Sequence, residues 1–402
     1  MTTTPPGADI APLMPTYAPN DVTFVRGEGS RLVDVDGKAY LDFLGGLAVT
    51  GLGHAHPAVA AAIAEAAGTL LHVSNLYRSV PGPKVAAVLD ELLGGGGKVF
   101  FTNSGAEANE CAIKLARRWG GRGRHVVVSA FGSFHGRTLA TLHATGQPGK
   151  HEAFQPLPEG FRHVAWQDVD ALEAAIDPSV VAVLLEPVQG EGGVHPATAE
   201  YFAAVRALCD ERNLLFLVDE VQTGLGRTGA WFAHQDLGVR PDVVTIAKAL
   251  GNGMPIGACW ARAEVADSFR PGDHGTTYGG QPLAASAALA VLETMRAEDV
   301  PARARRAGER LRAALEALDG VVAVRGRGLL LGVELAPGLD ARAVAAAALD
   351  GGLVVNPVTA DTIRLAPSLL VTDDEVDEAV ALLGTALAAV AAVATTPDEE
   401  PA

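Results

Sequence analysis

Five short, mostly apolar runs, each followed by a polar cluster and a helix-length stretch, constrain the fold of this chain more than any other feature. They cover residues 99–101, 126–128, 180–185, 214–218 and 243–246. Strands of a parallel sheet are covered by helices on both faces, so they form continuous apolar runs rather than alternating apolar and polar residues. The pattern therefore predicts an α/β fold with a mostly parallel central sheet.

The residues directly after these runs carry reactive or hydrogen-bonding side chains. They include Asn103 and Ser104, Ser129, Glu186, Asp219 with Glu220, and Lys248. Open α/β sheets bind ligands beyond the carboxyl ends of their strands. We therefore expect the five strand ends to face one site.

The pattern changes after Thr277, where long helices over residues 282–318 precede a glycine-rich hairpin at 321–335 and further helix. Strands are expected at residues 20–50, with a hairpin turn at 33–37. These features predict an N-terminal segment (1–50) that packs with a C-terminal small domain (286–402), beside a large domain (51–285). The alanine-rich stretch 379–394 is expected to be a packed helix, and residues 397–402 a disordered acidic end.

Composition excludes several classes of partner. The chain has 31 Lys and Arg against 47 Asp and Glu, a net charge of −16, which disfavours binding to nucleic acid or to an anionic membrane. Three widely spaced cysteines, Cys111, Cys209 and Cys259, fit neither a disulfide framework nor a metal site. His54 and His56 alternate like metal ligands but have no third ligand nearby, so no metal is expected. With no secretory pattern at the N-terminus, a cytoplasmic location is expected.

Lys248 and Asp219 are the strongest catalytic candidates. A lysine directly after a buried strand is partly desolvated, which lowers its pKa and favours a Schiff base, although surface lysines also occupy strand ends. Asp219 lies 29 residues earlier, the length of one βαβ step, and its carboxylate could pair with a protonated pyridine nitrogen or simply cap a turn. Gln222 is close enough in sequence to bond a substituent of the same ring.

Residues 103–109 predict a helix N-terminus that binds phosphate. Ser104 and Glu107 have the spacing of a capping box, which we expect to use the backbone amides of these two residues. The amides of Gly105 and Ala106 then remain free for an anion, and the glycine allows close approach.

The segment Phe134-His135-Gly136-Arg137-Thr138 offers an aromatic face and a guanidinium. Phe134 could stack on a flat ring and Arg137 could hold a carboxylate through two hydrogen bonds. Taken alone, the two residues could equally be a core phenylalanine and a solvated arginine.

Together these segments resemble the class III, fold-type I aminotransferases, which use pyridoxal phosphate (PLP). The resemblance spans residues from about Pro15 to about Thr372. Its motifs are Asn103-Ser104-Gly105-Ala106-Glu107-Ala108, Phe134-His135-Gly136-Arg137-Thr138, Asp219-Glu220-Val221-Gln222-Thr223-Gly224 and residues 245–251. Within the class, Pro15-Thr16-Tyr17, Ser74-Asn75-Leu76-Tyr77 and residues 51–57 are most similar to the acetylornithine aminotransferases.

The resemblance implies a role for each cofactor-binding residue. Lys248 would hold PLP covalently and transfer the proton, and Asp219 would pair with the ring nitrogen. Phe134 and Val221 would cover the two ring faces, Gln222 would bond the phenolic oxygen, and the Ser104, Gly105 and Ala106 turn would bind the phosphate. Thr277 is similar to the residue that reaches the phosphate from the neighbouring subunit, which implies a homodimer with active sites at the subunit interface.

The resemblance also implies substrate contacts. Arg137 and Thr276 would bind the α-carboxylate end of N2-acetylornithine, and Arg364 would bind the α-carboxylate of glutamate or 2-oxoglutarate. Glu191 is similar to the acid that neutralises this arginine when an ω-amine is bound. A movable pair of Glu191 and Arg364 would therefore switch the charge of the pocket.

The implied reaction transfers the δ-amino group of N2-acetyl-L-ornithine to 2-oxoglutarate, giving N-acetyl-L-glutamate 5-semialdehyde and L-glutamate in arginine biosynthesis. Another ω-amine remains an alternative: ornithine, succinylornithine, succinyl-diaminopimelate or 4-aminobutyrate. Ornithine aminotransferases have a tyrosine in the segment matching residues 44–50, where this chain has Leu47, which argues against free ornithine. An intramolecular aminomutase or a non-enzymatic dimer is a more distant alternative.

Overall fold

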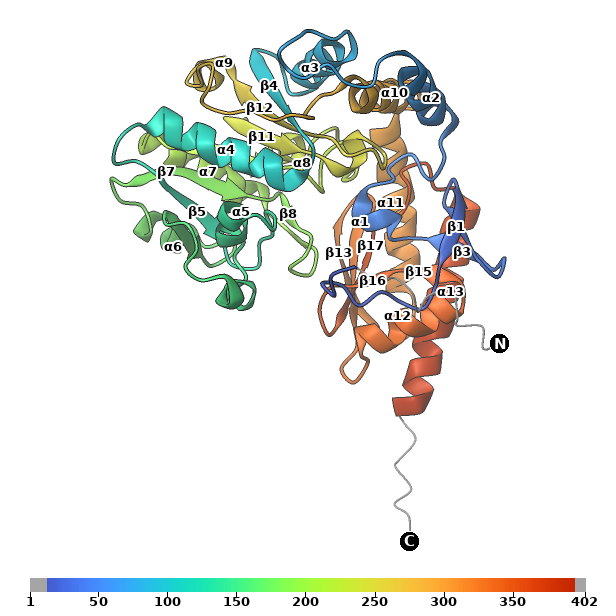
Figure 1. Ribbon diagram of the computed structural model, residues 1–402. Helices are drawn as coiled ribbons and strands as arrows, with labels where there is room; N and C mark the ends of the chain where they lie inside the picture. Colours follow the sequence, from blue (N-terminus) through green and yellow to red (C-terminus); the bar gives the residue numbers. More distant parts are fainter. Residues whose placement is uncertain (1–12, 395–402) are drawn as a thin grey trace.

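The computed structural model describes residues 13–394 and is built around a seven-stranded sheet (Figure 1). The strand order is β4 (Gly97–Thr102), β12 (Gly257–Arg262), β11 (Val243–Ile246), β10 (Leu215–Asp219), β7 (Val180–Leu185), β5 (Val126–Ala130) and β6 (Phe161–Val164). All five predicted strands are present. Only β12 runs against its neighbours, β4 and β11, so the other six strands share one direction.

Helices cover both faces of this sheet, which explains the continuous apolar runs. On one face, Phe202 of α7 (Ala199–Glu211) packs in a cluster with Phe216 and Val218 of β10. On the other face, α4 (Gly105–Gly120) packs in a cluster with Leu215 and Leu217 of the same strand. Strands β6 and β12 were not predicted, because Arg162 and His163 interrupt the first and Arg262 ends the second without a long aliphatic run.

The rest of the chain forms a smaller α+β part with two four-stranded sheets. One contains β1 (Phe24–Glu28), β2 (Arg31–Asp34), β3 (Ala39–Asp42) and β15 (Leu353–Val354), and the other β13 (Val321–Arg327), β14 (Leu330–Leu335), β17 (Thr362–Leu365) and β16 (Asn356–Pro357). The parallel pairing of β15 with β3 joins the two ends of the chain, as expected for strands within residues 20–50. The domain boundaries near residues 50 and 285 stay a prediction.

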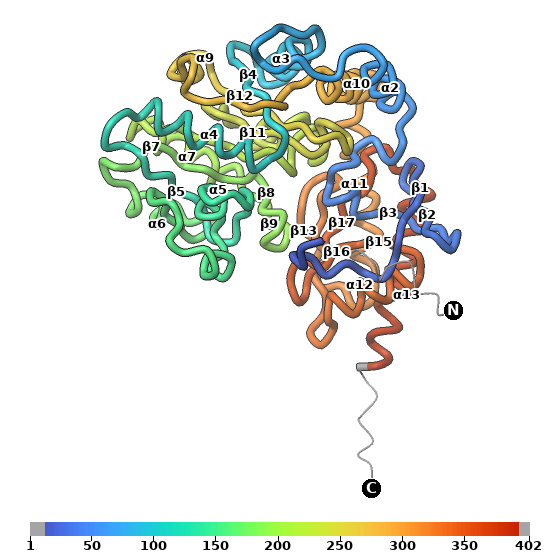
Figure 2. Tube along the Cα trace, in the orientation of Figure 1, coloured from blue at the N-terminus to red at the C-terminus, as the bar shows by residue number. Residues whose placement is uncertain are grey.

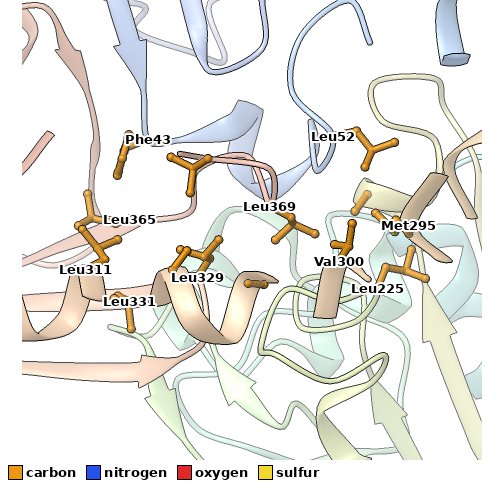
Figure 3. Close-up of a cluster of buried hydrophobic side chains, with 14 of the residues drawn as sticks. Phe43, Leu52, Leu225, Met295, Val300, Leu311, Leu329, Leu331, Leu365 and Leu369 are labelled. Carbon is orange, nitrogen blue, oxygen red and sulfur yellow. The ribbon is translucent and has the colours of Figure 1, made fainter. Parts of the chain in front are cut away.

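The remaining elements are short connections, helices beside the large sheet and helices that pack on the small sheets. They are α1 (Gly45–Ala48), α2 (Pro57–Thr69), α3 (Pro81–Leu92), α5 (Leu139–Ala144), α6 (Val169–Ala174), β8 (Val188–Gln189), β9 (His195–Pro196), α8 (Ala233–Asp236), α9 (Ala263–Ala266), α10 (Pro282–Ala297), α11 (Val300–Glu316), α12 (Ala341–Asp350) and α13 (Asp373–Ala394), with 3₁₀ turns at Pro148–Lys150, Glu152–Phe154 and Lys248–Leu250. The largest buried cluster runs without a break from Leu311 and Leu365 in the small part to Leu225 and Met295 beside the large sheet (Figure 3). The two parts therefore share one core.

The C-terminal helix α13 packs on the small part, as predicted. It contacts α11 and α12 and buries Val376, Ala379 and Leu383. By length and composition its segment Asp373–Val393 is also apolar enough to cross a membrane, a test that the core helices of globular proteins pass as well. The expected acidic end at 397–402, like residues 1–12, lies outside the described residues.

Candidate active site

A cavity of about 370 Å³ lies at the carboxyl edge of the large sheet, where the five predicted strand ends meet. The predicted site residues that line it are Ser104, Gly105, Ala106, Phe134, Arg137, Glu191, Asp219, Val221, Gln222 and Lys248. Arg364 joins them through its ion pair with Glu191. Parallel strands explain this convergence, because each turn after a strand opens at the same edge.

Lys248 follows β11 and has a positive φ of 45°, an uncommon backbone conformation for a side chain of this size. Burial and, after it, the positive charge of Arg364 lower the pKa of its amine to about 8, although Glu191 and Asp219 act in the opposite direction. A larger fraction of the neutral amine is therefore present near neutral pH than for an exposed lysine. The prediction of a partly desolvated nucleophile is consistent with this position.

Asp219 is held at the end of β10 by three hydrogen-bond donors. Its Oδ2 accepts from Asn109 Nδ2 at 2.7 Å and pairs with His135 Nδ1 at 2.8 Å, and its Oδ1 accepts from the amide of Val221 at 3.0 Å. Thr245 Oγ1 in turn donates to Asn109 Oδ1 at 2.7 Å. This network fixes the orientation of a buried carboxylate that faces the cavity.

Neither Asn109 nor His135 was predicted to act at the site. Asn109 is an asparagine buried on α4 among apolar residues, which is unusual unless its amide is fully bonded, and this signal could have identified it. His135 lies in the segment from Phe134 to Thr138. Its contact with Asp219 joins residues 84 positions apart in the sequence, so local spacing could not predict it.

The N-terminus of α4 forms the predicted capping arrangement with one correction. Ser104 Oγ accepts from the amide of Glu107 at 3.2 Å, but the Glu107 carboxylate accepts from the amide of Asn103 at 2.8 Å and not from Ser104, as had been expected. Within residues 13–394, the amides of Gly105 and Ala106 have no hydrogen-bond partner. Paired donors at a helix N-terminus suit a phosphate.

Glycine is required at position 105 for packing as well as for an anion. A Cβ atom there would lie 2.7 Å from Val221 Cγ1, closer than two carbon atoms can approach. Val221 is thereby placed directly beside the helix N-terminus. This contact was not expected from the sequence, where the glycine was explained by the anion alone.

Phe134 and Arg137 also line the cavity. The Arg137 guanidinium is 5.6 Å from the centre of the Phe134 ring, and Lys150 Nζ is 5.7 Å from the same centre. The Phe134 amide donates to Glu186 Oε2 at 3.2 Å. Burial, followed by the neighbouring charge of Asp219, raises the pKa of Glu186 well above its ordinary value.

Glu191 and Arg364 form the predicted ion pair. Arg364 Nη1 donates to Glu191 Oε1 at 2.6 Å and to Gln222 Oε1 at 3.3 Å, and its Nη2 donates to Asn356 Oδ1 at 2.7 Å. Burial opposes ionisation of Glu191, but the charge and hydrogen bond of Arg364 outweigh it and lower the pKa of the carboxyl. The side chain of Arg364 is only 1% exposed, so this cation depends on its anionic partner.

Thr276 and Thr277 are not brought into the cavity of their own chain. Thr276 Oγ1 accepts from Asn103 Nδ2 at 3.4 Å, beside the rim, whereas Thr277 is exposed and lines a separate hollow with His72 and Asn75. Neither threonine completes the site within one chain. Their predicted roles, which invoke a neighbouring subunit, stay predictions.

The residues of the cavity fit PLP. They offer a lysine, a fixed buried carboxylate, an aromatic ring and unpaired amides at a helix N-terminus, the groups that a phosphorylated pyridine aldehyde requires. Among residues 13–394, no group of three His, Cys, Asp or Glu side chains could hold a metal. His54 Nε2 instead lies 2.7 Å from Asp42 Oδ2.

Comparison with known proteins gives one family and close relatives within it. A family model for class-III aminotransferases matches residues 15–387. The acetylornithine aminotransferase of Caldanaerobacter subterraneus subsp. tengcongensis is 47% identical over 380 residues, covering 92% of this chain and 96% of the relative. The solved N-acetylornithine aminotransferase of Stenotrophomonas maltophilia is 38% identical, with a TM-score of 0.82, over 93% of this chain and 98% of its own. An ornithine aminotransferase structure from Toxoplasma gondii, described with partial occupancy of PLP at its active site, is 33% identical, with a TM-score of 0.91, over 96% of this chain and 94% of its own.

Proposed function

Since the chain belongs to the class-III aminotransferases, which are PLP enzymes, we propose that it transfers the δ-amino group of N2-acetyl-L-ornithine to 2-oxoglutarate. The products are N-acetyl-L-glutamate 5-semialdehyde and L-glutamate. The observation that carries this proposal is the ion pair of Glu191 and Arg364 beside Lys248, because it lets one cavity accept two differently charged substrates.

Each half-reaction presents a different charge to the cavity. The ω-end of N2-acetylornithine carries an ammonium, which an unpaired guanidinium would repel, so Glu191 neutralises Arg364 in this half-reaction. The α-carboxylate of glutamate or 2-oxoglutarate displaces Glu191 and bonds to the same guanidinium. The buried arginine is therefore paired with an anion in both half-reactions.

The other residues of the chain hold the cofactor and move one proton. Bound PLP supplies an aldehyde that exchanges amino groups and a ring that delocalises negative charge. Asp219 would pair with the ring nitrogen, Gly105 and Ala106 would donate to the phosphate, and Phe134 would cover one ring face. Lys248 Nζ would hold the cofactor and, once released, would accept and return the proton that the reaction moves.

N2-acetylornithine is favoured over other ω-amines by similarity to enzymes named for it over more than nine-tenths of the chain. The segment at residues 44–50 is consistent with this preference, because Val49 lines the cavity and no tyrosine is present there. The reaction would place the enzyme in arginine biosynthesis in the cytoplasm.

We further propose that the active unit is a homodimer whose interface contains the active sites. The segment between α2 and α3 exposes large apolar side chains, which are Leu70, Leu71, Leu76, Tyr77 and Val80. Tyr278 is exposed in the adjoining loop beside Thr277. A second copy covering this surface would bury these side chains and bring Thr277 to the partner's phosphate-binding turn.

A substrate panel tests the proposal. Single-turnover conversion of bound PLP, followed by absorbance, gives kcat/KM for N2-acetylornithine, ornithine, succinylornithine, succinyl-diaminopimelate and 4-aminobutyrate. We expect N2-acetylornithine to lead. If ornithine or 4-aminobutyrate leads by more than about tenfold, or roughly 1.4 kcal/mol, the substrate is wrong. Repeated turnover without 2-oxoglutarate would indicate an aminomutase, and a colourless protein that does not bind PLP would exclude an enzyme.

A further inference from the structure

The acid of the charge switch sits at the turn of a small hairpin, which we call the Glu191 hairpin (residues 188–197, containing β8 and β9). Figure 2 shows this hairpin reaching from the large sheet toward β13 of the small part, which it contacts. Its turn contains Val194 at a φ of 57°, a strained conformation for a β-branched residue. Such a turn keeps its shape only when the surrounding structure holds it.

The small part holds this turn by close packing. Val194 is fully buried in a cluster with Ala48, Leu330 and Ala366. Gly332 of β14 makes the approach possible, because a Cβ atom there would lie 2.8 Å from Val194 Cβ. The hairpin therefore rests directly on the sheet of β13, β14 and β17.

Two arginines of β13 also tie the hairpin to this sheet. Arg325 Nε donates to the carbonyl of Gly193 at 2.6 Å, two residues after Glu191, and Arg327 Nη2 donates to the carbonyl of Ala197 at 3.2 Å. Arg325 Nη1 and Nη2 bond to Glu334 and to Thr362 Oγ1, so the guanidinium is also fixed to the sheet that carries it. These residues belong to the Arg325-Gly326-Arg327-Gly328 run, in which only Gly328 lies between the strands.

The same sheet carries the other partner of the switch. Arg364 lies on β17 directly opposite Gly332 of β14, and Thr362, which Arg325 contacts, lies opposite Glu334. Arg325 thus connects the turn that carries Glu191 with the strand that carries Arg364. The distance between the two partners depends on this connection.

We propose that Arg325 is a positioning residue for substrate exchange, assisted by Arg327. Its hydrogen bond to Gly193 holds the hairpin where Glu191 can reach Arg364, so that the switch needs only a side-chain movement. Without this bond, Glu191 neutralises Arg364 less often, and the cationic ω-amine meets an unpaired guanidinium. This inference rests on the proposed function of the Glu191 and Arg364 pair.

The test compares the two half-reactions of the PLP-loaded enzyme. In Arg325→Met we expect the ratio of kcat/KM for N2-acetylornithine to that for glutamate to fall about tenfold, through the amine half-reaction. Arg325→Lys keeps the charge beside Glu334 but loses the planar donor set, so we expect a fall in the same direction of about threefold. If Arg325→Met does not fold, the ratio measured for Arg325→Lys tests the positioning role.

A matched control and a double variant separate positioning from general damage. Arg312 donates to the carbonyls of Val324 and Gly326 within the small part and does not contact the hairpin, so Arg312→Met should leave the ratio unchanged. Glu191→Gln should lower the ratio by itself, and adding Arg325→Met to it should cause no further fall, because Arg325 acts through Glu191.

The outcomes distinguish the two proposals. If Glu191→Gln leaves the ratio unchanged, the charge switch and the proposed function are wrong. If Glu191→Gln lowers the ratio but Arg325→Met and Arg325→Lys do not, only the positioning role is wrong. Two other results would overturn the positioning role. One is an equal loss of kcat/KM in both half-reactions of the Arg325 variants, and the other is a further fall of the ratio when Arg325→Met is added to Glu191→Gln.

Discussion

Replacement of Arg364 by methionine should separate the two half-reactions of this aminotransferase. The guanidinium is buried and bonds to Glu191, Gln222 and Asn356, so it is rigidly presented at the cavity. Methionine has a similar length and no charge, and it leaves the α-carboxylate of glutamate or 2-oxoglutarate without its partner. In the proposed mechanism, the N2-acetylornithine half-reaction does not use this guanidinium as a ligand.

The size of the expected fall in kcat/KM for glutamate follows from the burial of Arg364 and the carboxylate that it pairs with. Removing one member of a buried, hydrogen-bonded charge pair costs about 2–5 kcal/mol. At about 1.4 kcal/mol per tenfold, kcat/KM for glutamate should fall roughly 30-fold to several thousand-fold. The loss for N2-acetylornithine should stay within about threefold, because Glu191 remains available to the ω-ammonium and this half-reaction loses no ligand.

The assay is single-turnover conversion of bound PLP with glutamate and with N2-acetylornithine, measured for the same enzyme preparation. Arg137→Met is the matched comparison. Glutamate has a second carboxylate and N2-acetylornithine has an α-carboxylate, and Arg137 is the other guanidinium at the cavity, so its loss should slow both half-reactions. Equal losses for both substrates in Arg364→Met would refute the assignment of this arginine.

Three further predictions concern the cofactor. Because the pKa of Lys248 is lowered to about 8, the rate of PLP incorporation into the cofactor-free protein should rise about tenfold per pH unit below pH 8 and level off above it. A rate that still increases at pH 10 would show that Lys248 titrates like an exposed lysine. Asp219→Asn should keep bound PLP, seen by absorbance, but lower kcat about 100- to 1,000-fold, and wild-type turnover would contradict its role. In Gly190→Ala a Cβ atom would lie 1.7 Å from Gln222 Oε1. Overpacking costs about 1–3 kcal/mol, so the titrated Kd for PLP should rise about tenfold. Gly149→Ala, which places its Cβ in open space, should leave this Kd unchanged.

The sequence predicted those parts of the site that depend on local order along the chain. Asp219 and Lys248 could be placed together because each ends a buried strand, and parallel strands end at one edge. The phosphate-binding turn was predictable from a cap that spans only four residues. Even there, the partner of the Glu107 carboxylate was misassigned by one residue, because the choice of amide depends on the backbone path before the helix.

The parts that could not be predicted depend on contacts across long separations. Asn109 and His135 orient Asp219 over 110 and 84 residues of sequence, and Arg325 reaches Gly193 over 132. No periodicity or spacing encodes such a pair, since it exists only after both sheets have packed. The sequence placed Arg325 only within a glycine-rich hairpin, whereas in the structure its side chain bonds to Gly193, Glu334 and Thr362.

The burial of Arg364 gives a physical reason for the proposed charge switch. A guanidinium with only 1% of its side chain exposed has lost most of its hydration, and an unpaired buried cation is strongly destabilising. A permanent carboxylate partner would stabilise it but would block the glutamate half-reaction. A carboxylate that leaves whenever the substrate supplies its own satisfies both demands, provided that it returns to the same place. Under the proposed mechanism, the strained turn at Val194 and the Arg325 bond to Gly193 would provide that return, so the position of the hairpin, and not only the identity of Glu191, would set the balance between the two substrates.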